Sequence, residues 1–204
     1  MKKDSKNRVI PFFRGQSAAN TMKIADTFEF RRGGKLKDVS IAYETWGELD
    51  SSKSNVVVIF TGLSASSHVT SSSFNSAAGW WESMVGPGKS IDSDKHFIVC
   101  INTLGSCFGS TSPVSMNANT EQPYRLSFPE LTVEDMAKAS YTLLEKLGIS
   151  DIKILVGPSL GGMQALAFSI MFNQSVKNTI LISTATQATP YAIAIRSLQR
   201  EVIR

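Results

Sequence analysis

The sequence predicts an α/β fold with a mostly parallel sheet, and three observations support this prediction. Short, almost uninterrupted apolar runs recur along the chain, as in strands that are buried on both faces of a parallel sheet. Stretches with a helical spacing of apolar residues lie between these runs, so strands and helices alternate. The 204 residues are 42% hydrophobic and 19% charged, which is the composition of a globular domain.

The first 22 residues form a basic, polar lead, which we expect to be flexible and to precede one domain of residues 23–204. Residues 1–40 hold ten lysines and arginines against four acidic residues. Nucleic-acid binders usually concentrate such residues on a folded surface among stacking aromatics. We therefore interpret the excess of basic residues as a feature of a solvated tail, and we expect no nucleic-acid partner.

The chain has no apolar run near the roughly 18 residues that cross a bilayer, and its start lacks the apolar region of a secretory signal. We therefore expect no membrane partner. Cys100 and Cys107 are the two cysteines, too few for a disulfide framework, which favours a reducing, cytoplasmic location. Neither has partners at metal-ligand spacing, so we expect no metal site.

Six strands are predicted in chain order. Residues 28–30 and 39–43 alternate apolar and polar side chains around the turn at 31–34, which predicts an antiparallel hairpin. The apolar runs at 56–60, 97–101, 152–156 and 179–182 predict the buried parallel strands. If more strands follow residue 184 in a complete sheet, the strand at 179–182 would expose an apolar edge here.

Two helices are predicted between the later strands. Residues 132–147 place their apolar side chains on one face, with Thr132 and Asp135 at near-capping-box spacing and Gly148 at the end. Residues 160–172 carry no charge, so we expect this helix to be wedged into the core. Both suit right-handed crossovers between parallel strands.

Chemistry is expected at Ser159, in the motif Gly157-x-Ser159-x-Gly161 where a strand ends and a helix begins. Such a tight turn holds the serine in strained backbone angles and raises its hydroxyl above the sheet edge. The helix N-terminus supplies N–H groups for a developing oxyanion. The alternative is a glycine-rich turn whose serine only caps the helix.

A serine nucleophile needs a base, usually a histidine oriented by an acid that follows it in the chain. The 45 residues after Ser159 contain no histidine, and Glu201 is their sole acid. His68 and His96 both precede the serine, and we expect each to be structural. The chain thus carries a nucleophile without a visible means of activating it.

Several stretches resemble one enzyme family: 42–49 (AYETWGEL), 79–82 with 85–89, Asn102 with 105–107 and 109–111, 128–132, and the serine motif. This is the homoserine O-acetyltransferase family, acyl-CoA-dependent O-acyltransferases with an α/β-hydrolase fold. The resemblance covers about residues 26–204. Residues 61–68 (TGLSASSH) and 192–200 (AIAIRSLQR) are most similar to the branch that acylates serine with a succinyl group.

The resemblance implies a ping-pong reaction in which Ser159 becomes the acyl-enzyme. The N–H groups of Leu63 and Leu160 would form the oxyanion hole, and Arg200, assisted by Arg196, would hold the carboxylate of the amino-acid acceptor. The partners would be acetyl-CoA or succinyl-CoA and L-homoserine or L-serine, in methionine or cysteine biosynthesis. Acyl-CoA is a co-substrate, and no cofactor is implied.

Family members continue past residue 204 with a helical lid, further strands and the catalytic Asp and His, so we expect an incomplete α/β-hydrolase fold. We expect the intact protein to be a homodimer and the 204-residue chain alone to be inactive. Two alternatives stay open. One is a serine esterase of the same fold, and the other is an inactive fragment or one piece of a split gene.

Overall fold

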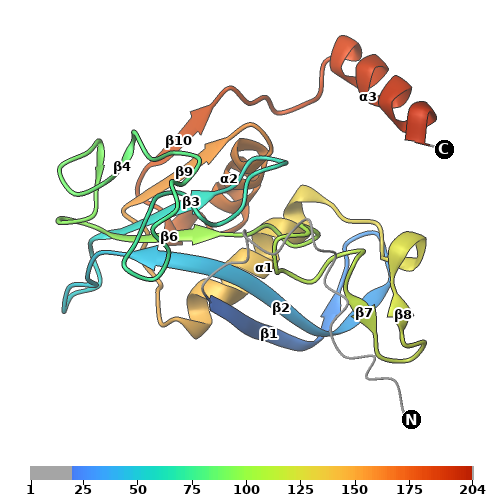
Figure 1. Cartoon of the computed structure of the whole chain (residues 1–204), viewed down its shortest axis with the longest axis horizontal. Helices are drawn as coiled ribbons and strands as arrows, with labels where there is room; N and C mark the ends of the chain where they lie inside the picture. Colours follow the sequence, from blue (N-terminus) through green and yellow to red (C-terminus); the bar gives the residue numbers. More distant parts are fainter. Residues whose placement is uncertain (1–19, 204) are drawn as a thin grey trace.

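A computed structural model describes residues 20–203, which form a six-stranded sheet with helices (Figure 1). The strand order is β1-β2-β6-β3-β9-β10. The bounds are β1 (Asn20–Glu29), β2 (Lys35–Trp46), β3 (Val56–Phe60), β6 (Phe97–Ile101), β9 (Ile154–Pro158) and β10 (Thr179–Ile182). The predicted lead lies outside the described residues up to residue 19, and β1 begins at Asn20.

The predicted antiparallel hairpin is confirmed, although its strands are longer than the alternation indicated. β1 pairs with β2 from Asn20↔Tyr43 to Glu29↔Lys35, and β2 also pairs antiparallel with β6. Strands β6, β3, β9 and β10 then run parallel. The fully buried β3 lies in the middle, as expected for a strand with both faces covered.

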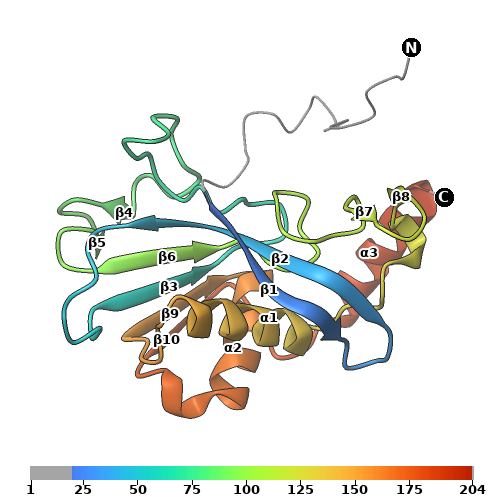
Figure 2. The same cartoon turned by 90° about the horizontal axis from the view of Figure 1, so that it is seen from below.

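Two layers cover the sheet. On one face, Val58 and Phe60 of β3 pack with Leu143 of α1 (Val133–Lys146) and Phe168 of α2 (Leu160–Met171). On the other face, Val57 and its neighbours pack under the segment that joins β3 to β6. Figure 2 shows α1 and α2 on one side of the sheet and this segment on the other.

The remaining elements are short and belong to the connections. They are β4 (Val85–Gly86) paired with β5 (Ile91–Asp92), β7 (Met116–Asn117) paired with β8 (Gln122–Pro123), and the 3₁₀ helices η2 (Arg125–Ser127) and η3 (Asn173–Ser175). The capping box predicted for α1 is confirmed, because Thr132 and Asp135 satisfy each other's backbone N–H groups.

The charge-free helix packs into the core as expected, but with one face only. α2 buries Gln164, Ala165 and Phe168 against the sheet, but Ile170 is 71% exposed on its outer face. The outer face is exposed because no described element covers it, and the lack of charged residues in the sequence does not reveal this. The apolar edge predicted at residues 179–182 is present, since β10 is the last strand of the sheet and exposes Ile180 and Leu181.

Helix α3 (Pro190–Ile203) ends the described chain and extends away from the sheet (Figure 1). Its side chains are largely exposed, Tyr191 and Leu198 among them. Among the described residues, no helix is both long and apolar enough to span a bilayer.

Candidate active site

Ser159 occupies the turn between β9 and α2 with φ 54° and ψ −120°, a conformation that costs a residue with a side chain of order 1–3 kcal/mol. Its N–H donates to the Ile182 carbonyl at 2.9 Å, and its carbonyl accepts from the Gly162 N–H at 3.0 Å. The side chain is exposed. The strained strand-to-helix turn that the motif predicts is therefore present, with the hydroxyl accessible to a substrate.

Close backbone approach explains the glycines around Ser159. A Cβ on Gly157 would lie 2.2 Å from the Gly161 carbonyl oxygen, and one on Gly161 would lie 2.5 Å from the Phe60 carbonyl oxygen. Any larger residue would force β9, α2 and β3 apart. Close packing of the backbone therefore requires glycine at positions 157 and 161, in addition to any requirement of the serine itself.

Both candidate oxyanion donors lie at the carboxyl edge of the sheet. Leu160 is the first residue of α2, and an N–H in the first turn has no acceptor within the helix. Leu63 lies in the loop that follows β3, the parallel neighbour of β9. A Cβ on Gly62 would lie 3.8 Å from the Pro158 carbonyl oxygen, so this loop passes beside the elbow.

Neither histidine is placed to act as a base for Ser159. The His68 ring is buried, with Nδ1 2.9 Å from Glu44 Oε2 and Nε2 2.8 Å from the Ala77 carbonyl oxygen. His96 directly precedes β6, so it lies at the amino edge of the parallel strands, opposite Ser159. The structural role expected for both histidines agrees with these positions.

The fold and the sequence of this chain are both similar to those of known proteins. A family model of the alpha/beta hydrolase fold matches residues 55–202. The chain belongs to the α/β-hydrolase fold family. Serine O-succinyltransferase of Stenotrophomonas maltophilia (strain K279a) is 52% identical over 177 residues, 87% of this chain and 48% of that protein. The corresponding enzyme of Litchfieldella anticariensis is also 52% identical, over 85% of this chain and 47% of its own length.

Solved structures show the same relationship. Esterase E22 has a TM-score of 0.78 and 33% identity, covering 86% of this chain and 50% of that one. Homoserine O-acetyltransferase from Bacillus anthracis has a TM-score of 0.77 and 30% identity, covering 84% and 48%. The resemblance found in the sequence is confirmed, and the chain spans about half the length of the relatives it matches.

Arg196 and Arg200 are not brought to Ser159 within the described α/β-hydrolase fold. Both extend from α3, where Arg196 donates to Gln199 at 3.3 Å and Arg200 donates to Ser197 at 3.2 Å. Figure 1 shows that α3 extends away from the sheet that carries the elbow. The role of the two arginines in holding a carboxylate stays a prediction.

A buried polar network beneath the elbow was missed by sequence reasoning. Gln164 of α2 is fully buried; its Oε1 accepts from Thr103 Oγ1 at 3.0 Å, and its Nε2 donates to Ser140 Oγ at 2.8 Å. Thr103 Oγ1 lies 3.5 Å from Thr61 Oγ1 at the end of β3. The network ties α1, α2 and two strand ends together. A lone glutamine in a charge-free apolar helix was the signal available.

A cavity of about 270 Å³ opens beside the Leu63 loop. Its lining residues are Ser64, Ala65, Ser66, His68, Ala77, Ala78, Gly79 and Trp80.

Among the residues that the structure describes, no group of three or more His, Cys, Asp or Glu side chains could hold a metal ion. Ser159 and the N–H groups at the start of α2 offer nucleophilic attack by a serine hydroxyl with backbone N–H stabilisation at this edge of the sheet.

Proposed function

We propose that this chain is the nucleophile-bearing half of an acyl-CoA-dependent O-acyltransferase that acts on L-serine or L-homoserine. The observation that carries the proposal is Ser159, strained and exposed at the start of α2 next to the loop of Leu63. The 52% identity to serine O-succinyltransferases favours succinyl-CoA as donor and L-serine as acceptor. Acetyl-CoA and L-homoserine are the second choice.

The reaction proceeds through a seryl ester in this proposal. Ser159 Oγ attacks the thioester carbonyl of the acyl-CoA and gives its proton to a histidine base. The N–H groups of Leu63 and Leu160 stabilise the tetrahedral oxyanion, each contributing on the order of 3 kcal/mol to lowering the barrier. The oxyanion collapses, and the histidine gives its proton to CoA, which leaves as the thiol. The acceptor hydroxyl then loses its proton to the histidine and attacks the seryl ester, and Ser159 Oγ takes up that proton as it leaves.

The base and its acid must come from outside this sequence, because no histidine follows Ser159 and Glu201 is the only acid there. We expect the 204-residue chain alone to be inactive for that reason. Transfer to an amino acid in preference to water also requires a lid that excludes solvent. No metal or organic cofactor is needed for this chemistry, since acyl-CoA is a co-substrate.

Further features of the proposal come from the resemblance. The intact protein would be a cytoplasmic homodimer in cysteine or methionine biosynthesis. Arg200 would hold the acceptor carboxylate, with Arg196 one turn earlier on the same helix. A guanidinium fork suits a carboxylate because it donates two parallel hydrogen bonds.

An esterase is the competing function, and the likeness to esterase E22 supports it. The test uses a chimera in which this chain is followed by the remaining residues of the Stenotrophomonas maltophilia relative. With succinyl-CoA and L-serine, we expect O-succinylserine to form faster than free succinate. Arg200→Ala should abolish transfer to serine while leaving acylation of Ser159 intact. A soluble, folded chimera that releases only free succinate, unaffected by serine and Arg200→Ala, would establish the esterase.

A further inference from the structure

Glu44 is a buried carboxylate, and its burial requires a positively charged partner. It lies on β2 with 3% of its surface exposed, opposite Cys100 of β6. A buried carboxylate is strongly destabilising unless it is paired and hydrogen-bonded. Among the described residues, the ion pair found for Glu44 is with His68, 24 residues later in the chain.

With Glu44 as a carboxylate, each ring nitrogen of His68 faces an acceptor oxygen, and both contacts are hydrogen bonds only when both nitrogens carry hydrogen. Nδ1 faces Glu44 Oε2 at 2.9 Å, and Nε2 faces the Ala77 carbonyl oxygen at 2.8 Å. A neutral imidazole has one N–H, so one nitrogen lone pair would point at an acceptor oxygen. The Asn75 amide nitrogen is a more distant neighbour of Nδ1, at 3.4 Å. The doubly protonated ring satisfies both short contacts.

The other charged and titratable groups nearby are consistent with this state. Glu82 acts on His68 from the same loop, and its own carboxylate contacts Lys89 at 3.3 Å. Burial alone would lower the pKa of His68, but the hydrogen bonds to Glu44 and Ala77 outweigh it and raise the pKa above its usual value of about 6.5. Burial and the charge of Glu44 keep Cys100 a neutral thiol, because both raise its pKa.

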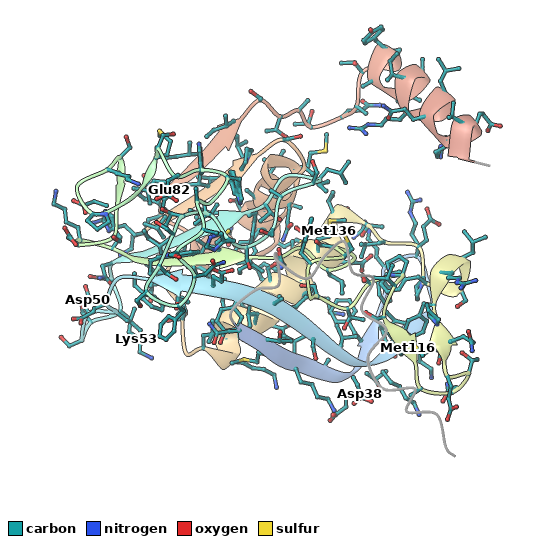
Figure 3. The ribbon with its side chains drawn as sticks, in the orientation of Figure 1. Asp38, Asp50, Lys53, Glu82, Met116 and Met136 are labelled. Atoms are coloured by element: carbon teal, nitrogen blue, oxygen red, sulfur yellow. The ribbon has the colours of Figure 1, made fainter. Side chains whose placement is uncertain are left out.

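His68 joins both limbs of the loop that begins with the Leu63 segment. On one limb, Ser66 accepts at its carbonyl from the Trp80 indole N–H at 2.8 Å. On the other limb, Ala77 accepts from the His68 ring. Glu82, labelled in Figure 3, closes the base of the loop by accepting from the N–H groups of Ser71 and Gly79 at 2.8 and 2.9 Å. Through Glu44, His68 anchors this assembly to the sheet.

We propose that His68 is held as an imidazolium between Glu44 and the Ala77 carbonyl, and that it is the positioning residue of the loop that presents the Leu63 N–H. The consequence for Leu63 rests on the proposed function, whereas the charge state of His68 does not. Because the pKa of His68 is raised on folding, the stabilisation is complete below about pH 6.5 and is lost as the pH rises through the folded value. The loop should therefore loosen as the pH rises through that value.

The charge state is tested by nitrogen-15 NMR of the 204-residue chain labelled at histidine. Only His68 and His96 give ring signals, and His96→Gln assigns them. We expect both His68 nitrogens to remain protonated at pH 6.5 in the wild type, and Glu44→Gln to bring deprotonation to lower pH. A His68 ring that is neutral at pH 6.5, or whose deprotonation is unchanged in Glu44→Gln, would overturn the proposal.

The positioning role is tested by amide hydrogen exchange and by acylation. Glu44→Gln, which keeps size and shape, should speed exchange at Ala65 and Trp80 about tenfold, the factor that corresponds to one net hydrogen bond. His96→Gln is the matched control and should leave both amides unchanged.

In the chimera, Glu44→Gln should slow acylation of Ser159 by on the order of 10-fold, less than the 10²–10³-fold of deleting an oxyanion donor. The wild-type rate should fall as the pH rises through the pKa of folded His68, and Glu44→Gln should shift that fall to lower pH. Normal exchange and acylation in Glu44→Gln would refute the positioning role. A wild-type chimera that never acylates would count against the proposed function alone, because the NMR and exchange results do not depend on it.

Discussion

Replacing Gly157 by alanine is the sharpest test of how the elbow is packed. Gly157 lies in β9 two residues before Ser159, and a Cβ there would lie 2.2 Å from the Gly161 carbonyl oxygen and 2.7 Å from the Gly162 nitrogen. Both are backbone atoms of the first turn of α2, which cannot rotate away as a side chain can. The matched control is Gly62→Ala, whose new Cβ would meet only the Pro158 carbonyl oxygen, at 3.8 Å.

The expected size of the effect follows from these distances. Overpacking a dense core typically costs 1–3 kcal/mol, and a clash with backbone belongs at or above the upper end of that range. For a domain of this size, 3 kcal/mol lowers Tm by about 6–12 °C. Gly62→Ala makes an ordinary van der Waals contact and reduces the entropy of the unfolded chain, so it should be neutral or stabilising by up to about 1 kcal/mol.

Thermal unfolding followed by circular dichroism measures the difference between the two variants. Gly157→Ala should melt at least 6 °C below Gly62→Ala, since about 3 kcal/mol separates them. Equal Tm values would show that α2 can move away from β9 at little cost, and the packing explanation of the elbow glycines would be wrong.

Other predictions concern strain, capping, the buried network and pH. Ser159→Gly should raise Tm by about 2–4 °C through relief of its positive φ, while Ser159→Ala should not; no rise in Ser159→Gly would argue against a strained turn. Thr132→Ala should cost about 0.5–2 kcal/mol in urea unfolding because it removes the capping box of α1, with Thr142→Ala, half-buried in the middle of the helix, as a control near zero. Gln164→Leu should cost about 1–3 kcal/mol by leaving buried partners unsatisfied, and a neutral result would mean that the network adds nothing. Wild-type stability should fall more steeply than that of His68→Gln as the pH rises above about 6.5, and parallel pH curves would contradict the raised pKa of His68.

The sequence was sufficient to predict those elements whose structure depends on residues that are close together in the chain. The hairpin, the four apolar strands, the capping box at Thr132 and the elbow at Ser159 are local patterns of period, capping and turn chemistry, and the structure contains all of them. The assignment of Leu63 came from the family resemblance and not from a local pattern, and the structure places its loop after β3, the parallel neighbour of β9.

Interactions between distant residues could not be derived in this way. Glu44 and His68 meet because β2 and the loop after β3 are brought together by the sheet, and no local pattern marks the pair. Gln164 reaches Thr103 across 61 positions. The exposed face of α2 and the position of α3 depend on what packs over them, which helical spacing alone does not specify.

Intact-mass spectrometry of the chimera with succinyl-CoA tests most directly whether Ser159 is the acyl-enzyme nucleophile. We predict a mass gain of one succinyl group that is absent in Ser159→Ala and disappears when L-serine is added. The 204-residue chain alone should show no gain, because it lacks a base after Ser159. A folded chimera that gains no mass, or a gain that persists in Ser159→Ala, would contradict the assignment of Ser159.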